Sequence, residues 1–299
     1  MRRELFIIHN PAAGPRRAEQ LRRQVEAALD ARKIPYAYSR TEAPGHAQEL
    51  AAAAVADGYG RVLVAGGDGT VLEVASALVG SDAVLALLPV GTGNQLAANL
   101  GVPKSLSGSL DVALKGSVRK IDVGMIDGRP FTVIAGAGYD AEVVRPRSEL
   151  KKRLGYLAYV HAATAAAFAP SPSTLRITVD GEQDTCRGIG VEVANMSGLT
   201  APLLPRPVDL VPDGRPDDGL LDVCVFAVET TLDFLSAMAS IVTRRYRRSR
   251  RLRYYRGREV VVEADPPLPV QIDGERQGTT TPFTATVRPR ALNVVVPAG

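Results

Sequence analysis

Four times in its first 115 residues, the chain runs from a short strand-like segment through a turn into a segment with helical periodicity. The predicted strands are residues 5–8, 36–39, 61–65 and 84–88, and each of the last two runs into a glycine-rich turn. Strands that alternate with helices in this way favour a parallel sheet with helices on its faces. We therefore expect this part of the chain to form an α/β domain.

The sequence changes character near Val118. From there on, short β-rich segments are separated by Gly, Pro and Asp, which is typical of a β-sandwich or barrel. Two predicted helices, at residues 150–168 and 231–245, interrupt these segments. We expect an α/β domain at residues 1–120 and a mostly β domain at residues 121–299. The predicted strands of the second domain are residues 121–126, 131–135, 175–179, 189–194, 220–226, 259–263, 270–272, 283–287 and 292–296.

The composition excludes several classes of protein. Hydrophobic residues make up 45% of the chain and charged residues 23%, which is typical of a globular protein and not of a disordered or collagen-like one. Two cysteines and three histidines are too few for a zinc centre or a disulfide scaffold. The start of the chain is too weakly apolar for a signal peptide, and no apolar run is long enough for a bilayer span. We therefore expect a cytoplasmic protein.

Glycine-rich turns follow three of the predicted strands. They are Asn10-Pro11-Ala12-Ala13-Gly14, Gly66-Gly67-Asp68-Gly69-Thr70 and Pro89-Val90-Gly91-Thr92-Gly93-Asn94. Glycines let the backbone approach a ligand closely and aim N–H groups at it, and a helix N-terminus behind them favours an anion. The turns lie at the carboxyl ends of parallel strands, where open α/β sheets bind ligands. We interpret them as a nucleotide or polyphosphate site.

Asp68 restricts which ligand could bind at these turns. Its carboxylate would repel a phosphate unless a cation lay between them, which points to a magnesium–nucleotide complex. A structural alternative is open for the same turn, because Thr70 with Glu73 three residues later has the form of a capping box. Glycine turns after strands are also common in α/β folds in general.

Two acidic turns stand out in the second half of the chain. Asp213, Asp217 and Asp218 lie among glycines, a composition that can hold a hard cation but more often simply makes a turn. Asp273-Gly274-Glu275 follows a predicted strand and has the form of a hairpin turn. Its functional interpretation is a general base, a carboxylate that takes a hydroxyl proton while the hydroxyl attacks a phosphorus atom.

In this order, the motifs resemble those of the bacterial diacylglycerol kinase-like lipid kinases, which are relatives of sphingosine and ceramide kinases. The resemblance implies a Rossmann-like parallel α/β domain and a C-terminal β-sandwich, as in NAD kinases and diacylglycerol kinases. The nucleotide would lie in the cleft between the domains, and the last strand, about residues 290–299, would return to the first domain. The matching motifs are Asn10-Pro-x-Ala-Gly14, Gly66-Gly-Asp-Gly-Thr70, Pro89-x-Gly-Thr-Gly-Asn94, Gly136-Ala-Gly-Tyr-Asp-Ala141, Leu154-Gly-Tyr-Leu-Ala-Tyr159, Asp217-Asp-Gly-Leu-Leu-Asp222 and Asp273-Gly-Glu275.

The resemblance also implies roles for individual residues. Asp68 would act on the phosphates of ATP through Mg²⁺. Asp273 and Glu275 match the turn that supplies the proton acceptor, and the sequence leaves open which of the two acts. Asp218, with the backbone carbonyls of Arg215 and Leu220, matches a second, structural magnesium site. The ATP site would be lined by Asn10, Thr41, Gly66, Gly67, Asp68, Gly69, Thr70, Val71, Leu72 and Thr92.

Two positions depart from the family pattern. Leu72 stands where the family commonly has Asn, and in this respect the chain is similar to NAD kinases. Gln95-Leu96 replaces a frequent Asp-Phe pair. A NAD kinase therefore remains an alternative, although Gly91-Thr-Gly-Asn94 speaks against it. A catalytically silent nucleotide-binding regulator is the second alternative.

Nine arginines and no acidic residue lie between Arg244 and Arg258, in a chain whose net charge is only +4. A lipid kinase must reach a substrate held in a bilayer, and basic residues favour an anionic surface. We expect this segment, with Tyr246, Tyr254 and Tyr255, to contact an anionic membrane surface, so that the protein is peripheral to the inner face of the membrane. The alternatives are a solvated helix end followed by an edge strand and, less favoured, nucleic-acid binding, for which no recognition motif is present.

Together the motifs predict a lipid kinase that transfers the γ-phosphoryl group of Mg-ATP to the hydroxyl of a membrane lipid, with diacylglycerol as the leading acceptor. Generic aliphatic residues around a lipid leave no readable code, so the sequence does not define the acyl-chain preference. It does not define the phosphate donor or the oligomeric state either. A homodimer is one option, since either domain could expose an edge strand.

Overall fold

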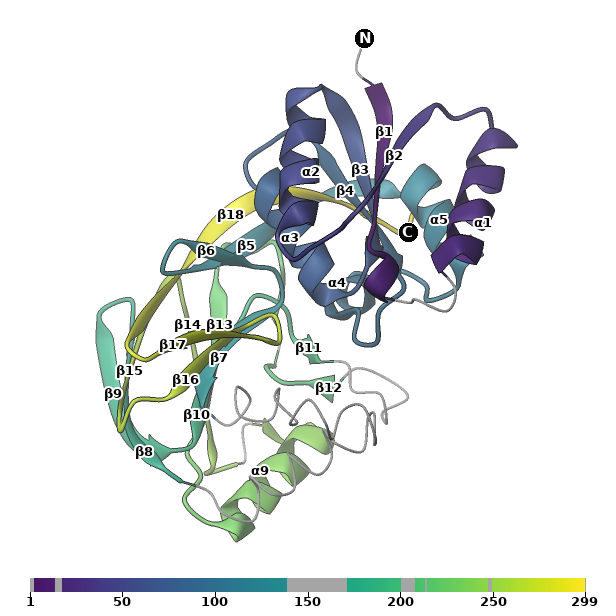
Figure 1. The fold of residues 1–299 in the computed structure, drawn as a ribbon. Helices are drawn as coiled ribbons and strands as arrows, with labels where there is room; N and C mark the ends of the chain where they lie inside the picture. The colour runs from purple at the N-terminus through teal and green to yellow at the C-terminus, as the bar shows by residue number, and fades with distance from the viewer. Residues whose placement is uncertain are drawn as a thin grey trace. The chain divides into compact units, whose positions relative to one another are not determined.

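The computed structural model describes residues 3–13, 18–138, 171–199, 208–212, 214–246 and 249–298 (Figure 1). The chain folds into two compact units. Unit 1 comprises Met1–Val123 and Pro289–Gly299, and unit 2 comprises Gly124–Arg288. Two strands, β5 (Ser117–Ile126) and β18 (Phe283–Val296), pass from one unit into the other. The predicted helix at residues 150–168 lies outside the described residues.

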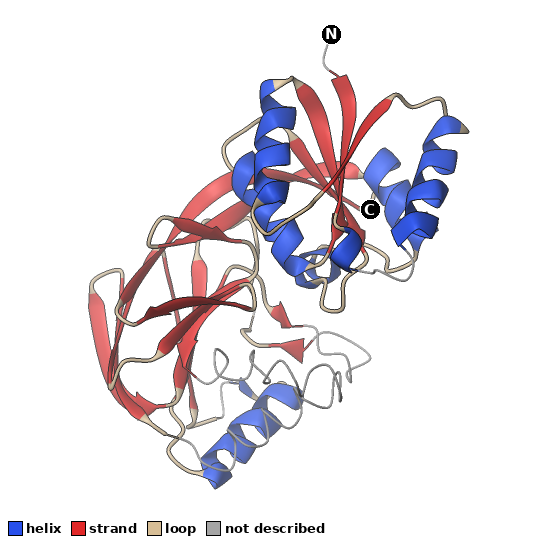
Figure 2. Ribbon diagram, viewed as in Figure 1, coloured by secondary structure: helices blue, strands red, loops and turns tan. Residues whose placement is uncertain are grey.

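Unit 1 is built on a parallel sheet with helices on both faces (Figure 2). Its strands lie in the order β2-β1-β3-β4-β18, and all neighbours in this order are parallel. The last part of β18 pairs Asn293 with Val84 and Val294 with Leu85, so a segment near the end of the chain completes a sheet that its beginning starts. The other strands are β1 (Arg3–His9), β2 (Tyr36–Arg40), β3 (Tyr59–Gly66) and β4 (Val84–Pro89).

The helices of unit 1 pack through apolar faces that repeat at helical spacing. In α1 (Ala18–Asp30), Leu21, Val25 and Leu29 follow one another every four residues and pack into one core with β1, β3, β4, β18 and α5. The alanine-rich α2 and its neighbour α3 lie on the opposite face of the sheet (Figure 1). The remaining helices are α2 (His46–Ala56), α3 (Asp68–Leu78), α4 (Gln95–Asn99) and α5 (Leu106–Lys115), with a 3-10 turn, η1, at Pro11–Ala13.

Unit 2 consists of antiparallel sheets and, in its described part, the helix α9 (Thr231–Val242). In one sheet, the first part of β18 pairs with β15 (Glu259–Asp265), followed by β8 (Ser173–Val179) and β9 (Glu182–Gly188). The second sheet has the order β14-β13-β10-β7-β16-β17. Its strands are β14 (Leu252–Gly257), β13 (Leu221–Phe226), β10 (Gly190–Ala194), β7 (Ile134–Gly138), β16 (Pro269–Ile272) and β17 (Glu275–Thr280).

The burial of each strand reflects its place in these sheets. Every residue of β10 and β13 is buried, because both strands are central, whereas buried and less buried residues alternate along β8. Three short strands complete unit 2: β6 (Arg129–Phe131) pairs with β5, and β11 (Gly198–Leu199) pairs with β12 (Val208–Asp209).

The predicted fold class is confirmed, since a parallel sheet with helices is followed by antiparallel sheets. The two strands predicted at residues 283–287 and 292–296 are one continuous strand, β18, and the helix predicted at 231–245 ends at Val242. The sequence did not predict β6, β9, β11, β12 or β17, and β14 was expected only as the edge strand of the alternative interpretation of the arginine-rich segment. None of the helices in the described part of the chain combines the length and hydropathy needed to cross a bilayer.

Candidate functional site

The three glycine turns of unit 1 end three adjacent parallel strands and are joined by hydrogen bonds. The turn after β1 reaches the turn after β3, because the Asn10 side-chain amide donates to the Thr70 hydroxyl over 2.8 Å. The same Asn10 side chain accepts from the Ala12 N–H at 2.9 Å, which fixes its own turn. The Thr41 N–H donates to the His9 carbonyl at 3.0 Å, so the end of β2 lies beside the end of β1. Four strand ends therefore meet at one edge of the sheet.

Close backbone contact between two turns explains why glycine is needed there. A Cβ atom added to Gly91 would lie 2.5 Å from the Cα of Gly67, which is far inside van der Waals contact. A Cβ added to Gly93 would lie 2.4 Å from a carboxylate oxygen of Asp68. The turns after β3 and β4 are thus in direct contact, and at Gly91, where the neighbour is backbone, no side chain fits. Behind the first of them α3 begins at Asp68, so its N-terminal N–H groups point toward the turn.

Asp68 is the side chain that joins these two turns. One carboxylate oxygen accepts the Asn94 N–H at 2.8 Å, and the other accepts the Gln95 N–H at 2.5 Å. Asn94 adopts a left-handed conformation with φ of 54°, and its side chain bonds both the N–H and the carbonyl of Gly91. The observed contacts of Asp68 are therefore structural, and its predicted action through Mg²⁺ stays a prediction.

The capping box predicted for Thr70 and Glu73 is wrong. The N-cap of α3 is Gly67, and no side chain caps it. The Thr70 hydroxyl is engaged by Asn10, and the Glu73 carboxylate accepts the N–H groups of Gly45 at 2.8 Å and Ala47 at 3.1 Å. Glu73 therefore satisfies the exposed donors at the start of α2.

The remaining residues predicted to contact ATP lie around the same turns. Val71 and Thr70 are buried in α3, whereas Leu72 is half-buried and Thr92 is exposed. Gly66 is buried at the end of β3, where an added Cβ would clash with the Thr70 side chain at 2.6 Å. The structure brings Asn10, Thr41, Gly66–Leu72 and Thr92 to one edge of unit 1, while Gly14 lies outside the described residues.

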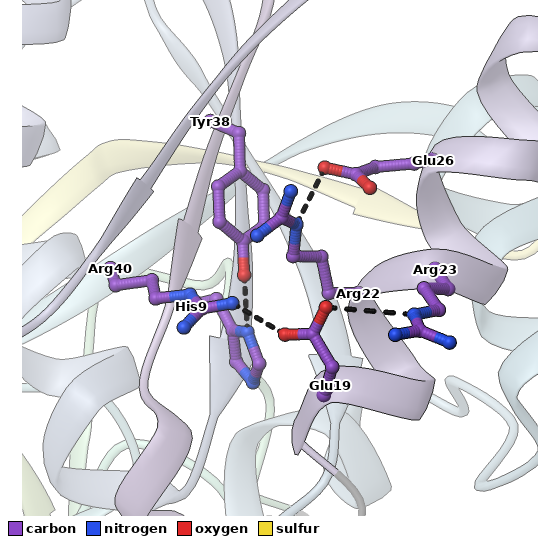
Figure 3. A network of polar contacts seen from close by, with 7 residues as sticks. All are labelled: His9, Glu19, Arg22, Arg23, Glu26, Tyr38 and Arg40. Atoms are coloured by element: carbon purple, nitrogen blue, oxygen red, sulfur yellow. Dashed lines mark hydrogen bonds and ion pairs between the residues drawn. The ribbon is translucent and has the colours of Figure 1, made fainter.

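Next to Asn10, a polar network links the ends of β1 and β2 to α1 (Figure 3). The buried His9 is hydrogen-bonded through Nδ1 to the Tyr38 hydroxyl at 2.5 Å. Arg40, which precedes Thr41, donates to Glu19 of α1 at 2.7 Å. Burial lowers the pKa of His9, and the positive charge of Arg40 lowers it further. The neutral form of His9 is therefore favoured beside the turn.

The network continues along α1. Arg22 donates to Glu26 at 2.9 Å, and its guanidinium lies 5.5 Å from the centre of the Tyr38 ring, within cation–π range. Arg23 forms an ion pair with Glu19 at 3.6 Å. The sequence did not reveal this cluster, because only the parallel register of β1 and β2, which sets Ile7 beside Tyr38 and His9 beside Arg40, brings these residues together.

In unit 2, the turn after β16 carries two acidic residues, of which Asp273 is buried and Glu275 is exposed. Asp273 is 7% exposed and its carboxylate accepts four hydrogen bonds. One oxygen accepts the N–H and the hydroxyl of Thr132, both at 2.7 Å, and the other accepts the N–H groups of Val133 and Ile134 at 2.9 Å. Burial raises the pKa of Asp273, and these hydrogen bonds oppose the shift. The acceptor sites of this carboxylate are filled by the protein itself.

Glu275, unlike Asp273, is accessible to solvent. It is exposed at the first position of β17, where it pairs with Ile272 of β16. Asp273 has a φ of 44° and Gly274 one of 82°, so the turn is a tight left-handed one that places Glu275 outside it. Only the second carboxylate of this turn is therefore presented to solvent.

At the predicted structural magnesium site, an arginine side chain pairs with the Asp218 carboxylate. The Asp218 carboxylate pairs with the Arg256 guanidinium, which also lies 3.4 Å from Asp222, and it accepts the Leu220 N–H at 3.1 Å. The described residues contain no group of three His, Cys, Asp or Glu side chains placed to hold a metal, and Asp213 lies outside them. The magnesium site built on the Asp218 carboxylate and the carbonyls of Arg215 and Leu220 stays a prediction.

Several arginines in the described part of the arginine-rich segment are engaged within unit 2. Arg244 pairs with an aspartate at 3.0 Å, Arg251 with another at 2.7 Å and Arg253 with a third at 2.6 Å. Tyr246 is buried with its hydroxyl donating to the Asp209 carbonyl, the Tyr254 hydroxyl is buried, and the Tyr255 hydroxyl donates to Asp184. The hydroxyls of the three tyrosines are thus buried or hydrogen-bonded within unit 2, and the expected contact of this segment with a membrane surface stays a prediction. β14, which carries the later arginines, is the edge strand that the alternative interpretation predicted.

Comparison with known proteins identifies related chains along both units. Residues 4–126 match the diacylglycerol kinase catalytic domain, and residues 133–296 match the YegS C-terminal NAD kinase beta sandwich-like domain. A Pseudomonas fluorescens protein named "Probable lipid kinase YegS-like" is 32% identical, with 99% of this chain and 96% of that protein covered. A Bacillus subtilis diacylglycerol kinase is 27% identical over 97% of this chain and 95% of that protein.

A solved structure agrees with this assignment at the level of the fold. A Bacillus anthracis diacylglycerol kinase superimposes with a TM-score of 0.76 at 20% sequence identity, covering 98% of this chain and 97% of that one. The two domain matches together span nearly the whole chain and follow the order of its two units. The chain therefore belongs to the diacylglycerol kinase family of kinases, with the catalytic domain and the NAD kinase-like β-sandwich domain that define it.

Proposed function

We propose that the protein is an ATP-dependent lipid kinase that transfers the γ-phosphoryl group of Mg-ATP to the hydroxyl of diacylglycerol. The observation that carries this proposal is the contact of two glycine turns at Gly67 and Gly91 at the N-terminus of α3. Backbone N–H groups without side chains around them can surround phosphate oxygens, and the helix end adds a partial positive charge. The names of the relatives support a lipid as the acceptor.

In the proposed reaction, the lipid hydroxyl oxygen forms a bond to the γ-phosphorus while the bond from this phosphorus to the β–γ bridging oxygen breaks. The electron pair of the broken bond leaves with ADP, and the hydroxyl proton passes to a carboxylate. Glu275 suits this role, because it is exposed, whereas the Asp273 carboxylate already accepts four hydrogen bonds. Asp273 instead fixes the turn from which Glu275 projects.

The Mg²⁺ that accompanies ATP would neutralise phosphate charge and needs no dedicated protein cage. Asp68 is the acidic residue of the glycine-rich motif that the resemblance assigns to Mg²⁺. In the structure, its carboxylate accepts the N–H groups of Asn94 and Gln95. Its proposed contribution to the reaction is therefore to hold the two phosphate-binding turns together.

Purified protein should be supplied with Mg-ATP and offered diacylglycerol micelles, sphingosine micelles and NAD in parallel reactions. We expect phosphorylated diacylglycerol, and a drop in kcat of about 10²–10⁴ in Glu275→Gln with the KM for ATP unchanged. Product from NAD alone would replace the proposal by a NAD kinase, in agreement with Leu72. ATP binding without turnover on any acceptor, unaffected by Glu275→Gln, would indicate the silent regulator.

A further inference from the structure

Helix α9 has a well-formed inner face. It begins with a capping box, in which the Thr230 hydroxyl accepts the Asp233 N–H at 3.2 Å and the Asp233 carboxylate accepts the Thr230 N–H at 3.1 Å. Phe234, Ala237 and Ile241 follow at helical spacing and are buried. The helix is therefore fixed to unit 2 along one side and by its first turn.

The opposite face of α9 is apolar and exposed. Leu232 is 77% exposed, Leu235 56% and Val242 67%, and the exposed Ala239 continues the same stripe. The spacing of three, four and three residues places these side chains on one side of the helix. Val118 is the only other large hydrophobic residue exposed in the described part of the chain, so the exposed apolar surface is concentrated on this helix.

No charge interrupts this stripe. Asp233 is the only charged residue of α9, is 8% exposed and pairs with Arg251 at 2.7 Å. A helix on the surface of a soluble domain normally carries charged residues on its outer side. The outer side of α9 offers only Leu, Ser, Ala and Val, which fits an apolar medium better than water.

Positive charge lies where the helix ends. Arg244 and Arg245 follow the C-cap residue Thr243, and Arg244 turns the chain out of the helix with a φ of 54°. Arg244 shares its charge with Asp209, whereas no described carboxylate forms an ion pair with Arg245 or Arg250. The acidic groups near the other end are also matched, because Glu229 pairs with Arg187 at 3.3 Å. Arg245 therefore lies just beyond the end of the apolar stripe, and Arg250 directly precedes Arg251, which pairs with Asp233 in the first turn of α9.

We propose that the stripe of Leu232, Leu235, Ala239 and Val242 docks on the surface of an anionic lipid bilayer, with Arg245 and Arg250 against the lipid phosphates. Apolar side chains of an interfacial helix enter the boundary between headgroups and acyl chains, and nearby cations add attraction to anionic lipids. This inference rests on the proposed function, because a kinase that phosphorylates a bilayer lipid must settle on the bilayer to reach it. It moves the membrane contact from the arginine segment as a whole to α9 and the two cations.

The test uses the triple variant Leu232→Ser, Leu235→Ser, Val242→Ser of the full chain. Binding is measured by flotation with phosphatidylcholine vesicles that contain phosphatidylglycerol. Turnover is measured on dioleoylglycerol held in these vesicles and on dioctanoylglycerol in detergent micelles. Val118→Ser is the matched control, since it removes an exposed apolar side chain from another part of the protein. Circular dichroism and the Tm confirm that each variant is folded.

We expect vesicle binding by the triple variant to fall about tenfold or more, with a matching loss of turnover on vesicle-held substrate. Its turnover on the micellar substrate, and all properties of Val118→Ser, should equal those of the wild type. The double variant Arg245→Ala, Arg250→Ala should lose binding to phosphatidylglycerol vesicles more than to phosphatidylcholine alone, whereas Lys104→Ala, an exposed charge in unit 1, should not.

Three results would overturn the proposal. They are wild-type binding by the triple variant, a loss of micellar turnover as large as the loss on vesicles, and a wild-type dimer that the triple variant converts to a monomer in light scattering. The last result would mean that a second copy of the chain covers α9. Failure of the proposed function would give a different result. If the protein bound vesicles through α9 but phosphorylated no lipid, the docking proposal would stand and the proposed lipid kinase activity would be wrong.

Discussion

Replacing Asp273 by asparagine should destabilise unit 2 while leaving its backbone path intact. Asparagine tolerates the left-handed φ of 44° about as well as aspartate, so the substitution changes the hydrogen bonds and not the turn. The carboxylate accepts two donors on each oxygen, and an amide nitrogen in place of either oxygen leaves a donor facing a donor.

The magnitude follows from these contacts. If the amide nitrogen faces Thr132, the hydroxyl can rotate to accept a hydrogen bond, and one backbone N–H is left unsatisfied at a cost of about 1–3 kcal/mol. The oxygen that remains has lost its charge, which weakens the hydrogen bonds from Val133 and Ile134 by roughly 1 kcal/mol in total. We therefore expect the free energy of unfolding to fall by about 2–4 kcal/mol, a large share of the stability of a typical domain.

The assay compares Asp273→Asn with Glu275→Gln in urea unfolding and in hydrogen exchange of the three amides that donate to Asp273. Asp273→Asn should lose stability and amide protection at Thr132, Val133 and Ile134. Glu275→Gln changes an exposed side chain and should stay within about 0.5 kcal/mol of the wild type. The reasoning is refuted if Asp273→Asn unfolds like the wild type but loses kcat as Glu275→Gln does, because Asp273 would then act in the chemistry.

Three further predictions concern unit 1. Gly91→Ala should lower stability and raise the KM for ATP about tenfold or more, because its Cβ would lie 2.5 Å from the Cα of Gly67. The Cβ of Gly67→Ala would lie 3.6 Å from the Cα of Gly91, an ordinary van der Waals contact, so this variant should keep wild-type stability in thermal unfolding. Equal losses in both variants would contradict the contact. Because the pKa of His9 is lowered in the folded state, its contribution to stability is complete above about pH 6.5 and is lost as the pH falls from there toward the lowered value. The free energy of unfolding of His9→Gln should therefore fall less steeply than that of the wild type between pH 7.5 and 5, and parallel curves would rule this out. Glu73→Ala should cost about 1–2 kcal/mol by uncapping α2, and unchanged stability in urea would show that this cap is not needed.

The strands that the sequence predicted are those with a buried apolar pattern, and the strands that it missed lie at sheet edges. β9 ends one antiparallel sheet of unit 2, and β17 is one edge of the other. All six residues of β17 are exposed or half-buried, so no alternation of apolar and polar residues marks it. An edge strand is defined by its pairing with a neighbour, which the local sequence does not encode.

In the candidate site too, features that depend on neighbouring residues could be predicted, and contacts between residues far apart in the sequence could not. The glycine turns could be predicted, because each follows its strand directly, and their close contact at Gly67 and Gly91 agrees with that prediction. The partners of the acidic side chains could not, since Glu73 caps a helix more than 20 residues away and Asp273 binds a segment near Thr132. A motif defines which residue type stands at a position, whereas the groups that bind its carboxylate are defined by how distant segments pack in the folded chain.

The passage of β5 and β18 between the units determines when each unit can be completed during synthesis. Unit 2 is one continuous stretch of chain, but unit 1 needs residues from both sides of it. Until residues 289–298 leave the ribosome, β4 lacks its neighbour, and the core beneath α1 and α5 lacks Val295. We therefore expect unit 2 to fold before unit 1, the reverse of the common order in which the N-terminal domain folds first. Unit 2 can fold while unit 1 is still incomplete, so a chain cut short near its end has no finished unit 1.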